Sequence, residues 1–324
     1  MDNRDTSKVR ERTMLQTAMG PLIGSALADA DVVEVMVNPD GKIWLDRHSS
    51  GRAFTGNQLA SADAERIIRL VASHLRVECH ADNPIVSAEL PGRGERFEGV
   101  LPPVAPAPCF AIRKPAKVLY ELDDYVSAQI MTSLQADVLN EAVHRRRNIV
   151  VIGGTGSGKT TLLNALLAVV AKTGDRVLIL EDTRELHCAA PDTVSLRTKP
   201  GVATLATLVR STLRLRPDRI IVGEVRGPEA IDMLKAWNTG HPGGLATLHA
   251  NSAHGGLYRL EQLIQEAVVT VPRRLIAQAI DVVVFITGRG EARRVETIAE
   301  VRRLKADGDY ELKSLVPLHA VQSS

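Results

Sequence analysis

The segment from residue 153 to residue 160 has the residue types and spacing of a phosphate-binding loop. It fits the pattern G-x4-G-K-[ST], and its residues are Gly153, Gly154, Thr155, Gly156, Ser157, Gly158, Lys159 and Thr160. Glycines let the backbone approach phosphates closely, and a helix from Thr161 would add its dipole and free N–H groups. Lys159 would reach the β- and γ-phosphates, and the hydroxyl of Thr160 would hold Mg²⁺. The alternative, a turn without a ligand, gives Lys159 no role, so the sequence predicts a nucleoside triphosphate site.

Acidic residues that follow apolar runs are the candidates for the chemical step. A phosphate loop works with an acidic residue at the end of a neighbouring strand, which serves the metal ion or the attacking water. One run ends in Glu181 and Asp182 and looks like the usual apolar run followed by Asp. Another ends in Gly223 and Glu224, and a glutamate there could act as general base on water. The alternative for the first pair is helix capping or an ion pair with Arg184, and both runs remain candidates on these grounds.

A histidine-containing segment, TGHPGGLATLHANS at 239–252, follows further along the chain. Metal binding by its histidines lacks support, because no cysteine or carboxylate joins them at ligand spacing. We expect Thr247 and His249 at a strand end that faces the γ-phosphate, as polar sensors. The alternative for His241 is a histidine in a turn.

The elements that must position these residues change in character along the chain. Before residue 115, helices are expected at 14–27 and 62–75, and short strands at 32–37, 42–46, 85–90, 96–101 and 110–113. From residue 133, helices alternate with strands that are apolar on both faces, at 148–152, 177–180 and 220–222, and antiparallel strands follow in 281–315. Strands of this kind are typical of a parallel sheet covered on both sides. The sequence predicts an α/β domain at 135–324, a smaller α+β N-terminal domain at 1–118 and a linker at 119–134.

The composition excludes several classes of protein. The 324 residues include 40 basic and 38 acidic side chains, a net charge of +2, which argues against a protein that coats a polyanion. With four Phe, four Tyr and two Trp, few aromatic rings could stack on bases, so direct nucleic-acid binding is expected to be weak or absent. The three cysteines have no CxxC spacing, which favours neither disulfides nor zinc and fits a reducing cytoplasm.

The apolar stretches are too short to span a membrane. The N-terminus lacks the apolar core of a signal peptide, and the longest apolar runs fall short of the ~18 residues that a spanning helix needs. We therefore expect a cytoplasmic protein whose membrane association, where it occurs, is peripheral.

Arginine supplies thirty of the forty basic residues. Clusters occur at 145–147, at 302–303, and at Arg210, Arg214, Arg216 and Arg219. Arginine is preferred over lysine where geometry matters, at phosphates or subunit contacts. The alternative is a set of solvated helix faces, and it has at least equal support at 145–147.

Four segments in this order, GGTGSGKT, LILEDTREL, LRPDRIIVGEVRG and TGHPGGLATLHANS, resemble the secretion-ATPase superfamily. Its members power type II secretion, type IV pili and type IV secretion, and the chain is most similar to the type IV secretion branch. The resemblance extends to the N-terminal segments VVEVMVNPDGKIW, FEGVLPPV and FAIRKP. It implies a homo-hexameric ATPase ring in which an N-terminal domain is linked to a RecA-like C-terminal domain, with ATP and Mg²⁺ between the two.

The resemblance also assigns roles to residues. Gly223 and Glu224 match the family's atypical Walker B motif, which makes Glu224 the catalytic base. Glu181 and Asp182 match its Asp box, expected near the metal ion, and the segment that ends at His249 matches its His box.

Arginines of the N-terminal domain reach the phosphates in such enzymes. The best matches are Arg96 and Arg113, and a positive charge there would stabilise the transition state at the γ-phosphate. The alternative is that both arginines are solvated or paired with Glu95 and Glu98.

Two departures from the wider superfamily favour conjugation over pilus assembly. The paired CxxC zinc motif of type II assembly ATPases is missing, and the N-terminal module is compact. We therefore expect a motor for conjugative type IV secretion that works with inner-membrane components at the cytoplasmic face. The alternatives are a pilus or type II secretion ATPase, a nucleic-acid pump, and a scaffold that binds ATP but hardly turns it over. GTP is disfavoured because no NKxD segment is present.

Overall fold

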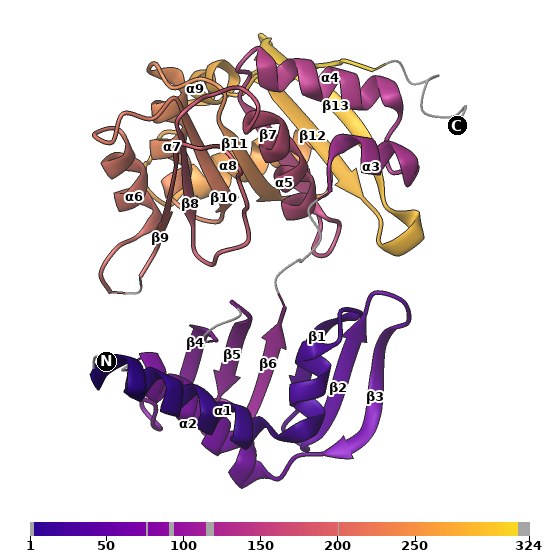
Figure 1. The fold of residues 1–324 in the computed structure, drawn as a ribbon. Coiled ribbons are helices and arrows are strands. Elements are labelled where there is room, and N and C mark those ends of the chain that lie inside the picture. Colours follow the sequence, from indigo (N-terminus) through magenta and orange to yellow (C-terminus); the bar gives the residue numbers. More distant parts are fainter. Residues whose placement is uncertain (1–2, 76, 91–93, 115–119, 200, 317–324) are drawn as a thin grey trace. The chain divides into compact units, whose positions relative to one another are not determined.

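The computed structural model describes residues 3–75, 77–90, 94–114, 120–199 and 201–316. The chain divides into two compact units, residues 1–117 and 118–324. Figure 1 shows the elements of each unit along the chain. Each unit has its own buried core and is described by itself.

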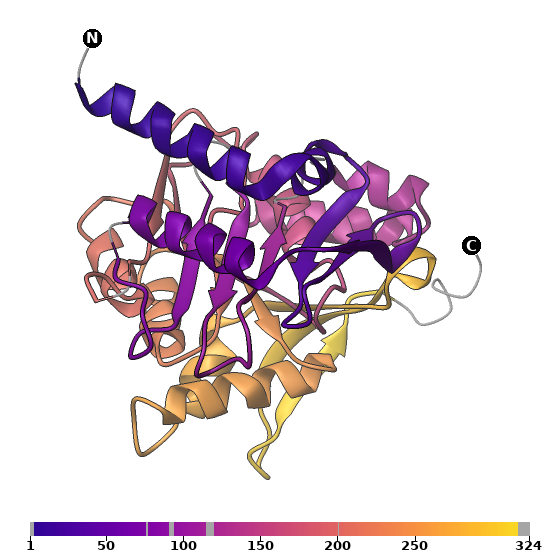
Figure 2. The same ribbon diagram turned by 90° about the horizontal axis from the view of Figure 1, so that it is seen from below.

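The described strands of the first unit form an antiparallel sheet of six, in the order β3-β2-β1-β6-β5-β4. The elements are α1 (Asn3–Ala28), β1 (Val32–Val37), β2 (Lys42–Arg47), β3 (Gly51–Gln58), α2 (Ser61–Leu75), β4 (Ile85–Glu89), β5 (Arg96–Val100) and β6 (Cys109–Arg113). Helices α1 and α2 lie on one face of this sheet (Figures 1 and 2), and Ile23, Ile67 and Ile112 are buried between them. The predicted α+β fold is confirmed.

Two features of the first half of the chain differ from expectation. Strand β3 was not predicted, because most of its side chains are exposed and its sequence, GRAFTGNQ, lacks an apolar face. The residues expected as a linker, 119–134, contain helix α3 (Leu122–Ser127). Leu122 and Tyr125 of this helix are buried in the core of the second unit, so the described part of this segment belongs to that unit.

The second unit is built on a mixed sheet of eight described strands, in the order β14-β13-β12-β7-β11-β10-β8-β9. Its strands are β7 (Ile149–Gly153), β8 (Val177–Glu181), β9 (Thr193–Arg197), β10 (Arg219–Val225), β11 (Leu245–His249), β12 (Val282–Thr287), β13 (Arg294–Leu304) and β14 (Tyr310–Ser314). Strands β7 to β12 pair in parallel, and β13 and β14 pair antiparallel. The predicted α/β fold is confirmed.

Helices cover both faces of this sheet, as its strands of continuous apolar residues require. On one face the core packs under α3, α4 (Ser133–His144) and α5 (Lys159–Val170). On the other face it packs under α6 (Leu205–Thr212), α7 (Glu229–Asn238), α8 (Ala253–Gln265) and α9 (Arg273–Ala279). A 3-10 turn, Gly290–Ala292, lies between β12 and β13.

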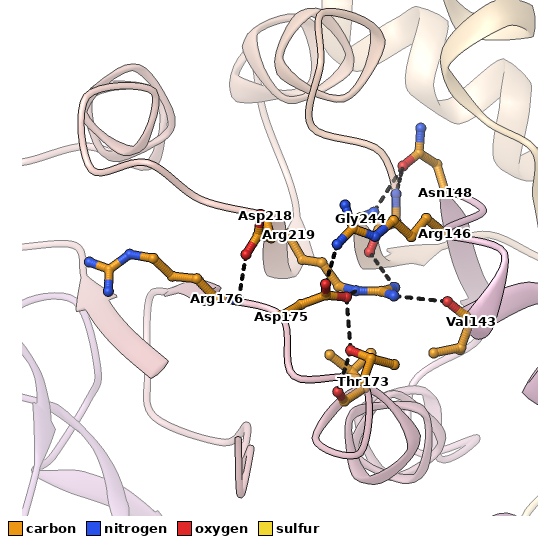
Figure 3. A network of polar contacts seen from close by, with 11 residues as sticks. Val143, Arg146, Asn148, Thr173, Asp175, Arg176, Asp218, Arg219 and Gly244 are labelled. Atoms are coloured by element: carbon orange, nitrogen blue, oxygen red, sulfur yellow. Dashed lines mark hydrogen bonds and ion pairs between the residues drawn. The ribbon is translucent and has the colours of Figure 1, made fainter. Parts of the chain in front are cut away.

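The amino ends of the parallel strands are held by a buried ion pair, shown in Figure 3. Arg219, at the start of β10, has no exposure to solvent, and its Nε donates to Oδ2 of Asp175 at 2.6 Å. Its Nη2 donates to the carbonyl of Val143 at 2.9 Å, after which helix α4 ends. The side chains of Thr173 and Arg146 also donate to the Asp175 carboxylate. This one pair therefore connects the segments that precede β7, β8 and β10.

Asn148 extends the same network to a fourth connection (Figure 3). Its Oδ1 accepts from the backbone N–H groups of Gly243 and Gly244, each at 2.8 Å, and its Nδ2 donates to the carbonyl of Ala279. A Cβ at Gly244 would lie 2.1 Å from the ring of Trp237, so only glycine fits there. The start of β11 is thereby tied to the start of β7.

We predict that Asp175→Ala destabilises the second unit strongly. The variant leaves the Arg219 guanidinium buried without its carboxylate, and breaking a buried pair in this way costs about 3–5 kcal/mol. Equilibrium denaturation in a Trp44→Phe background, followed by the fluorescence of Trp237 as the one remaining tryptophan, would measure the free energy of unfolding of this unit. The matched control is Asp192→Ala. It removes an ion pair with Arg176 in which the carboxylate is exposed to solvent, and this loss should cost less than about 1 kcal/mol.

The same variant should show a defined pH dependence. Burial by itself raises the pKa of Asp175, but the hydrogen bonds from Arg219 and Thr173 outweigh it and hold the pKa below its usual range. A carboxyl with a lowered folded-state pKa stabilises the protein above its unfolded pKa, and this contribution disappears as the pH falls through the folded pKa. The stability difference between wild type and Asp175→Ala should therefore narrow below about pH 4. A pH-independent difference would mean that the lost packing, not the charge, carries the effect.

Candidate active site at the carboxyl edge of the sheet

The phosphate-binding loop, residues 153–160, connects the carboxyl end of β7 to the start of α5. Gly156 and Gly158 have φ values of +76° and +97°, which L side chains rarely adopt. At Gly153 a Cβ would lie 2.4 Å from the carbonyl oxygen of Ile286 in the neighbouring strand β12. At Gly154 it would meet nothing within 4 Å, so the loop is open on that side.

Lys159 is buried at the first position of α5 and points back across the loop. Its Nζ donates to the carbonyl of Gly154 at 2.9 Å. The same Nζ lies 3.3 Å from Nε2 and 3.4 Å from Nδ1 of His249. His249 reaches this position because β11 pairs with β7 and sets His249 opposite Gly153.

Glu224 is aimed by an irregularity in the pairing of β10 with β11. Val222 pairs with Ala246 and Val225 pairs with Leu248, so Gly223 and Glu224 stand opposite Thr247 alone. Thr247 is buried, and its Oγ1 donates to the carbonyl of Gly223 at 2.6 Å. Bulges of this kind redirect side chains and are common beside active sites. Thr247 therefore supports the strand bearing Glu224, a role that the expected sensor function did not include.

Gly223 is favoured by the packing of the neighbouring strand, since its own φ is not positive. A Cβ at this position would lie 3.1 Å from Cγ of Glu181 in β8. A side chain there would press on a buried carboxylate, so the glycine in the Gly-Glu motif has a packing cause.

The carboxylate of Glu224 is contacted on both of its oxygens. Oε2 pairs with Nη2 of Arg226. Oε1 lies 2.9 Å from Nε2 of His249, but the angle between them is not that of a hydrogen bond, and this buried oxygen has no hydrogen-bond partner among the described residues. Burial and the nearby charge of Lys159 lower the pKa of His249, although Glu224 acts in the opposite direction. The lowered pKa favours the neutral imidazole, and the side chain of His249 lies between those of Lys159 and Glu224.

A cavity of about 360 Å³ opens beside these groups. Its lining residues are Thr155, Glu224, Val225, Arg226, Leu248, His249 and Arg259. The sequence analysis gave Arg226 and Arg259 no role at this site. Arg226 is two residues after Glu224, and this spacing could have predicted that it lines the site. Arg259 belongs to α8, and nothing in the sequence predicts that it lies there.

Glu181 and Asp182, predicted near the metal ion, have other contacts in the structure. Oε1 of Glu181 accepts from the backbone N–H groups of Glu185 and Leu186, each at 2.8 Å. Oδ1 of Asp182 accepts from the hydroxyl of Thr198 at 2.9 Å. In the part of the chain that the structure describes, no group of three or more His, Cys, Asp or Glu side chains is placed to hold a metal ion. The role of the two carboxylates toward Mg²⁺ stays a prediction.

Arg96 and Arg113 lie in the first unit, where the structure brings them together. They are paired residues of the adjacent strands β5 and β6, and Arg113 is also paired with Glu34 of β1. Residues directly opposite in neighbouring strands point to the same face of a sheet. Glu89 of β4 is likewise paired with Arg96, so the two arginines lie side by side in a row that has a glutamate at each end. Their role toward the phosphates stays a prediction.

The second unit combines a strand, a glycine-rich loop and a helix with an acidic residue at the end of another parallel strand of the same sheet, which defines the P-loop class of nucleotide-binding folds. Residues 20–293 match the family described as Type II/IV secretion system protein, and the chain belongs to this family. The predicted resemblance is confirmed.

Among related proteins, the chain is 48% identical to the probable conjugal transfer protein TrbB of Sinorhizobium fredii, over 93% of this chain and 92% of that protein. It is 31% identical to the type IV secretion system protein PtlH of Bordetella pertussis, over 84% and 91% of the two chains. The crystal structure of the pilus retraction motor PilT with bound ADP has a similar fold, with a TM-score of 0.63 and 18% identity over 92% of this chain and 83% of that chain.

We predict that Glu181→Gln stabilises the protein at alkaline pH. Burial raises the pKa of Glu181 to about 7, although the two backbone N–H groups act against it. The folded state thus holds a proton that the unfolded state has lost, and the wild type loses stability as the pH rises from about 4.5 to 7. Glutamine has no such proton and its Oε1 can accept the same two hydrogen bonds.

Urea denaturation at two pH values measures this effect. At pH 5 the free energies of unfolding of wild type and Glu181→Gln should be similar, and at pH 8 the variant should be more stable by up to about 3 kcal/mol. The exposed control Glu141→Gln should show no such divergence. A variant that is less stable than wild type at pH 8 would show that the ionised carboxylate is needed there.

Proposed function

We propose that this protein is an ATP-hydrolysing motor for conjugative type IV secretion. The observation that carries the proposal is the convergence of Lys159, His249 and Glu224 beside the open phosphate-binding loop. Membership of the Type II/IV secretion system family and the 48% identity to a conjugal transfer protein support the cellular role.

The geometry fits in-line attack of water on the γ-phosphate of ATP. Backbone N–H groups of residues 153–160 and the start of α5 would bind the phosphates, with Thr161 at the helix N-terminus. Nζ of Lys159 would exchange the Gly154 carbonyl for phosphate oxygens, which carry more negative charge. Glu224, which lines the cavity, would accept the proton of the attacking water, and His249 would orient its carboxylate.

The residues present fit a magnesium ion that is bound together with nucleotide. Mg²⁺ usually takes one or two protein ligands and completes its shell with phosphates and water, so a cage of protein ligands is not required. The hydroxyl of Thr160 would hold the ion, with Asp182 or Glu181 near it. The ion would neutralise charge that develops on the phosphates.

Arg96 and Arg113 are proposed as the cationic pair that the N-terminal domain contributes. Their shared face on adjacent strands supports a joint role. Two guanidinium groups near the γ-phosphate would stabilise charge in the transition state, as arginine fingers do.

We further propose a homo-hexamer at the cytoplasmic face of the inner membrane, working with inner-membrane components of a conjugation apparatus. None of the described helices is long and apolar enough to cross a bilayer, which fits peripheral attachment. The chain has 48% identity to a conjugal transfer protein and 18% to the pilus motor, and this difference favours conjugation over the alternative of a pilus or type II secretion ATPase.

Lys159→Gln and Glu224→Gln should each reduce ATP turnover by a factor of about 100 or more, because one removes the phosphate contact and the other the base. Phosphate release assays on purified protein would measure this, with melting temperatures as the check on folding. Lys172→Gln, an exposed lysine on the same unit, should retain activity. Undiminished turnover in both site variants would refute the assignment.

Activity should depend on assembly. Size-exclusion chromatography with light scattering, in Mg²⁺ and a non-hydrolysable ATP analogue, should give a mass of six 35.1 kDa subunits, with ATPase activity in that fraction. A fully active monomer would contradict the ring mechanism while leaving ATP hydrolysis intact.

A further inference from the structure

The turn between β12 and β13 places two arginines against backbone carbonyls of the phosphate-binding loop. Arg289 donates to the carbonyl of Thr155 through Nε at 3.2 Å and Nη2 at 2.8 Å. Arg293 donates to the carbonyl of Gly156 through Nη2 at 3.4 Å. More than 130 residues separate donors and acceptors along the chain, and they meet because β12 is the parallel neighbour of β7.

The loop is shaped to accept these side chains. A Cβ at Gly156 would lie 3.3 Å from Nε of Arg289, and one at Gly158 would lie 3.1 Å from Nε of Arg293. These glycines therefore provide room for the arginines in addition to adopting positive φ. Nε of Arg293 is buried without a hydrogen-bond partner among the described residues. Since an unpaired buried donor is costly, this N–H is available for a further hydrogen bond to the loop.

The direction of the loop's N–H groups follows from the contacts on its carbonyls. A trans peptide is planar, so its C=O and N–H point to opposite sides. The N–H of Gly156 therefore points away from Arg289, which binds the Thr155 carbonyl, and the N–H of Ser157 points away from Arg293, which binds the Gly156 carbonyl. The contacts of Ser157 agree, because its N–H and Nζ of Lys159 both donate to the carbonyl of Gly154.

We propose that Arg289 and Arg293 are positioning residues that hold the phosphate-binding loop in the conformation that binds a triphosphate. They act through the backbone of residues 155–157, and their charge adds to the attraction for anions. The proposal rests on the proposed ATPase function, since it concerns the same site. The arginines of the β12–β13 turn would hold the loop that binds the phosphates of ATP. It predicts weaker nucleotide binding rather than slower chemistry, because neither residue lines the cavity beside Glu224.

Binding and turnover measured on the full chain would test this. The variants are Arg289→Ala, Arg293→Ala and Arg289→Lys, and the control is Arg294→Ala, an exposed neighbour that pairs with Glu296. Arg289→Ala and Arg293→Ala should raise the KM for ATP about tenfold and change kcat less than about twofold. The inhibition constant of inorganic tripolyphosphate, which lacks the base, should rise by a similar factor. Arg289→Lys should recover only part of the affinity, because an ammonium lacks the planar fork that makes two bonds to one carbonyl.

The outcomes separate this proposal from the proposed function. A wild-type chain that binds no ATP would refute the function itself. If Arg289→Ala and Arg293→Ala bind ATP and tripolyphosphate as tightly as Arg294→Ala, the positioning role is refuted and the proposed function is not. A loss of kcat at unchanged KM would also refute the positioning role alone. If Arg289→Ala does not fold, Arg289→Lys and Arg293→Ala face the same criteria, with melting temperatures measured without nucleotide.

Discussion

Arg219 and Asp175 form an ion pair that is almost closed to solvent, at the edge of the sheet opposite the candidate site. Each parallel strand rises about 3.3 Å per residue, and a shift of one residue would turn every side chain to the other face. By holding the amino ends of β8 and β10 in register, the pair determines which residues stand at the carboxyl ends. The placement of Glu181 beside Gly223, and of the bulge that bears Glu224, depends on this register.

At the carboxyl ends of the strands the side chains are positioned by a β-bulge, whereas the amino ends are held by an ion pair. Gly223 leaves space for a buried carboxylate, Thr247 bonds the displaced carbonyl, and Glu224 is turned toward the cavity. His249 then joins Glu224 to Lys159 across β11, which lies between β10 and β7. Glu224 from β10 and Lys159 from the start of α5 are thus brought to the same side of the sheet through His249.

Arginine has different roles in different parts of the molecule, and sequence spacing did not separate them. Arg219 was grouped with Arg210, Arg214 and Arg216 as a candidate for interfaces, yet it is fully buried and structural. The sequence analysis gave Arg289 and Arg293 no role, yet they contact the phosphate-binding loop. A guanidinium group binds carboxylates, carbonyls and phosphates alike, so its role is decided by which of these the fold brings near.

The sequence by itself determined the phosphate-binding loop, the Gly-Glu strand end, both fold classes and the family, because each depends on residues close together in the chain. Apolar runs of continuous or alternating pattern also predicted most strands, while the exposed strand β3 lacked such a pattern. Only the tertiary structure decided the strand order, which sets β12 beside β7 and β11 between β7 and β10. Contacts such as His249 with Lys159, or Arg289 with Thr155, follow from that order. These contacts cannot be predicted from the sequence. Strands pair through backbone hydrogen bonds, which carry no residue-specific signal of which strands are neighbours.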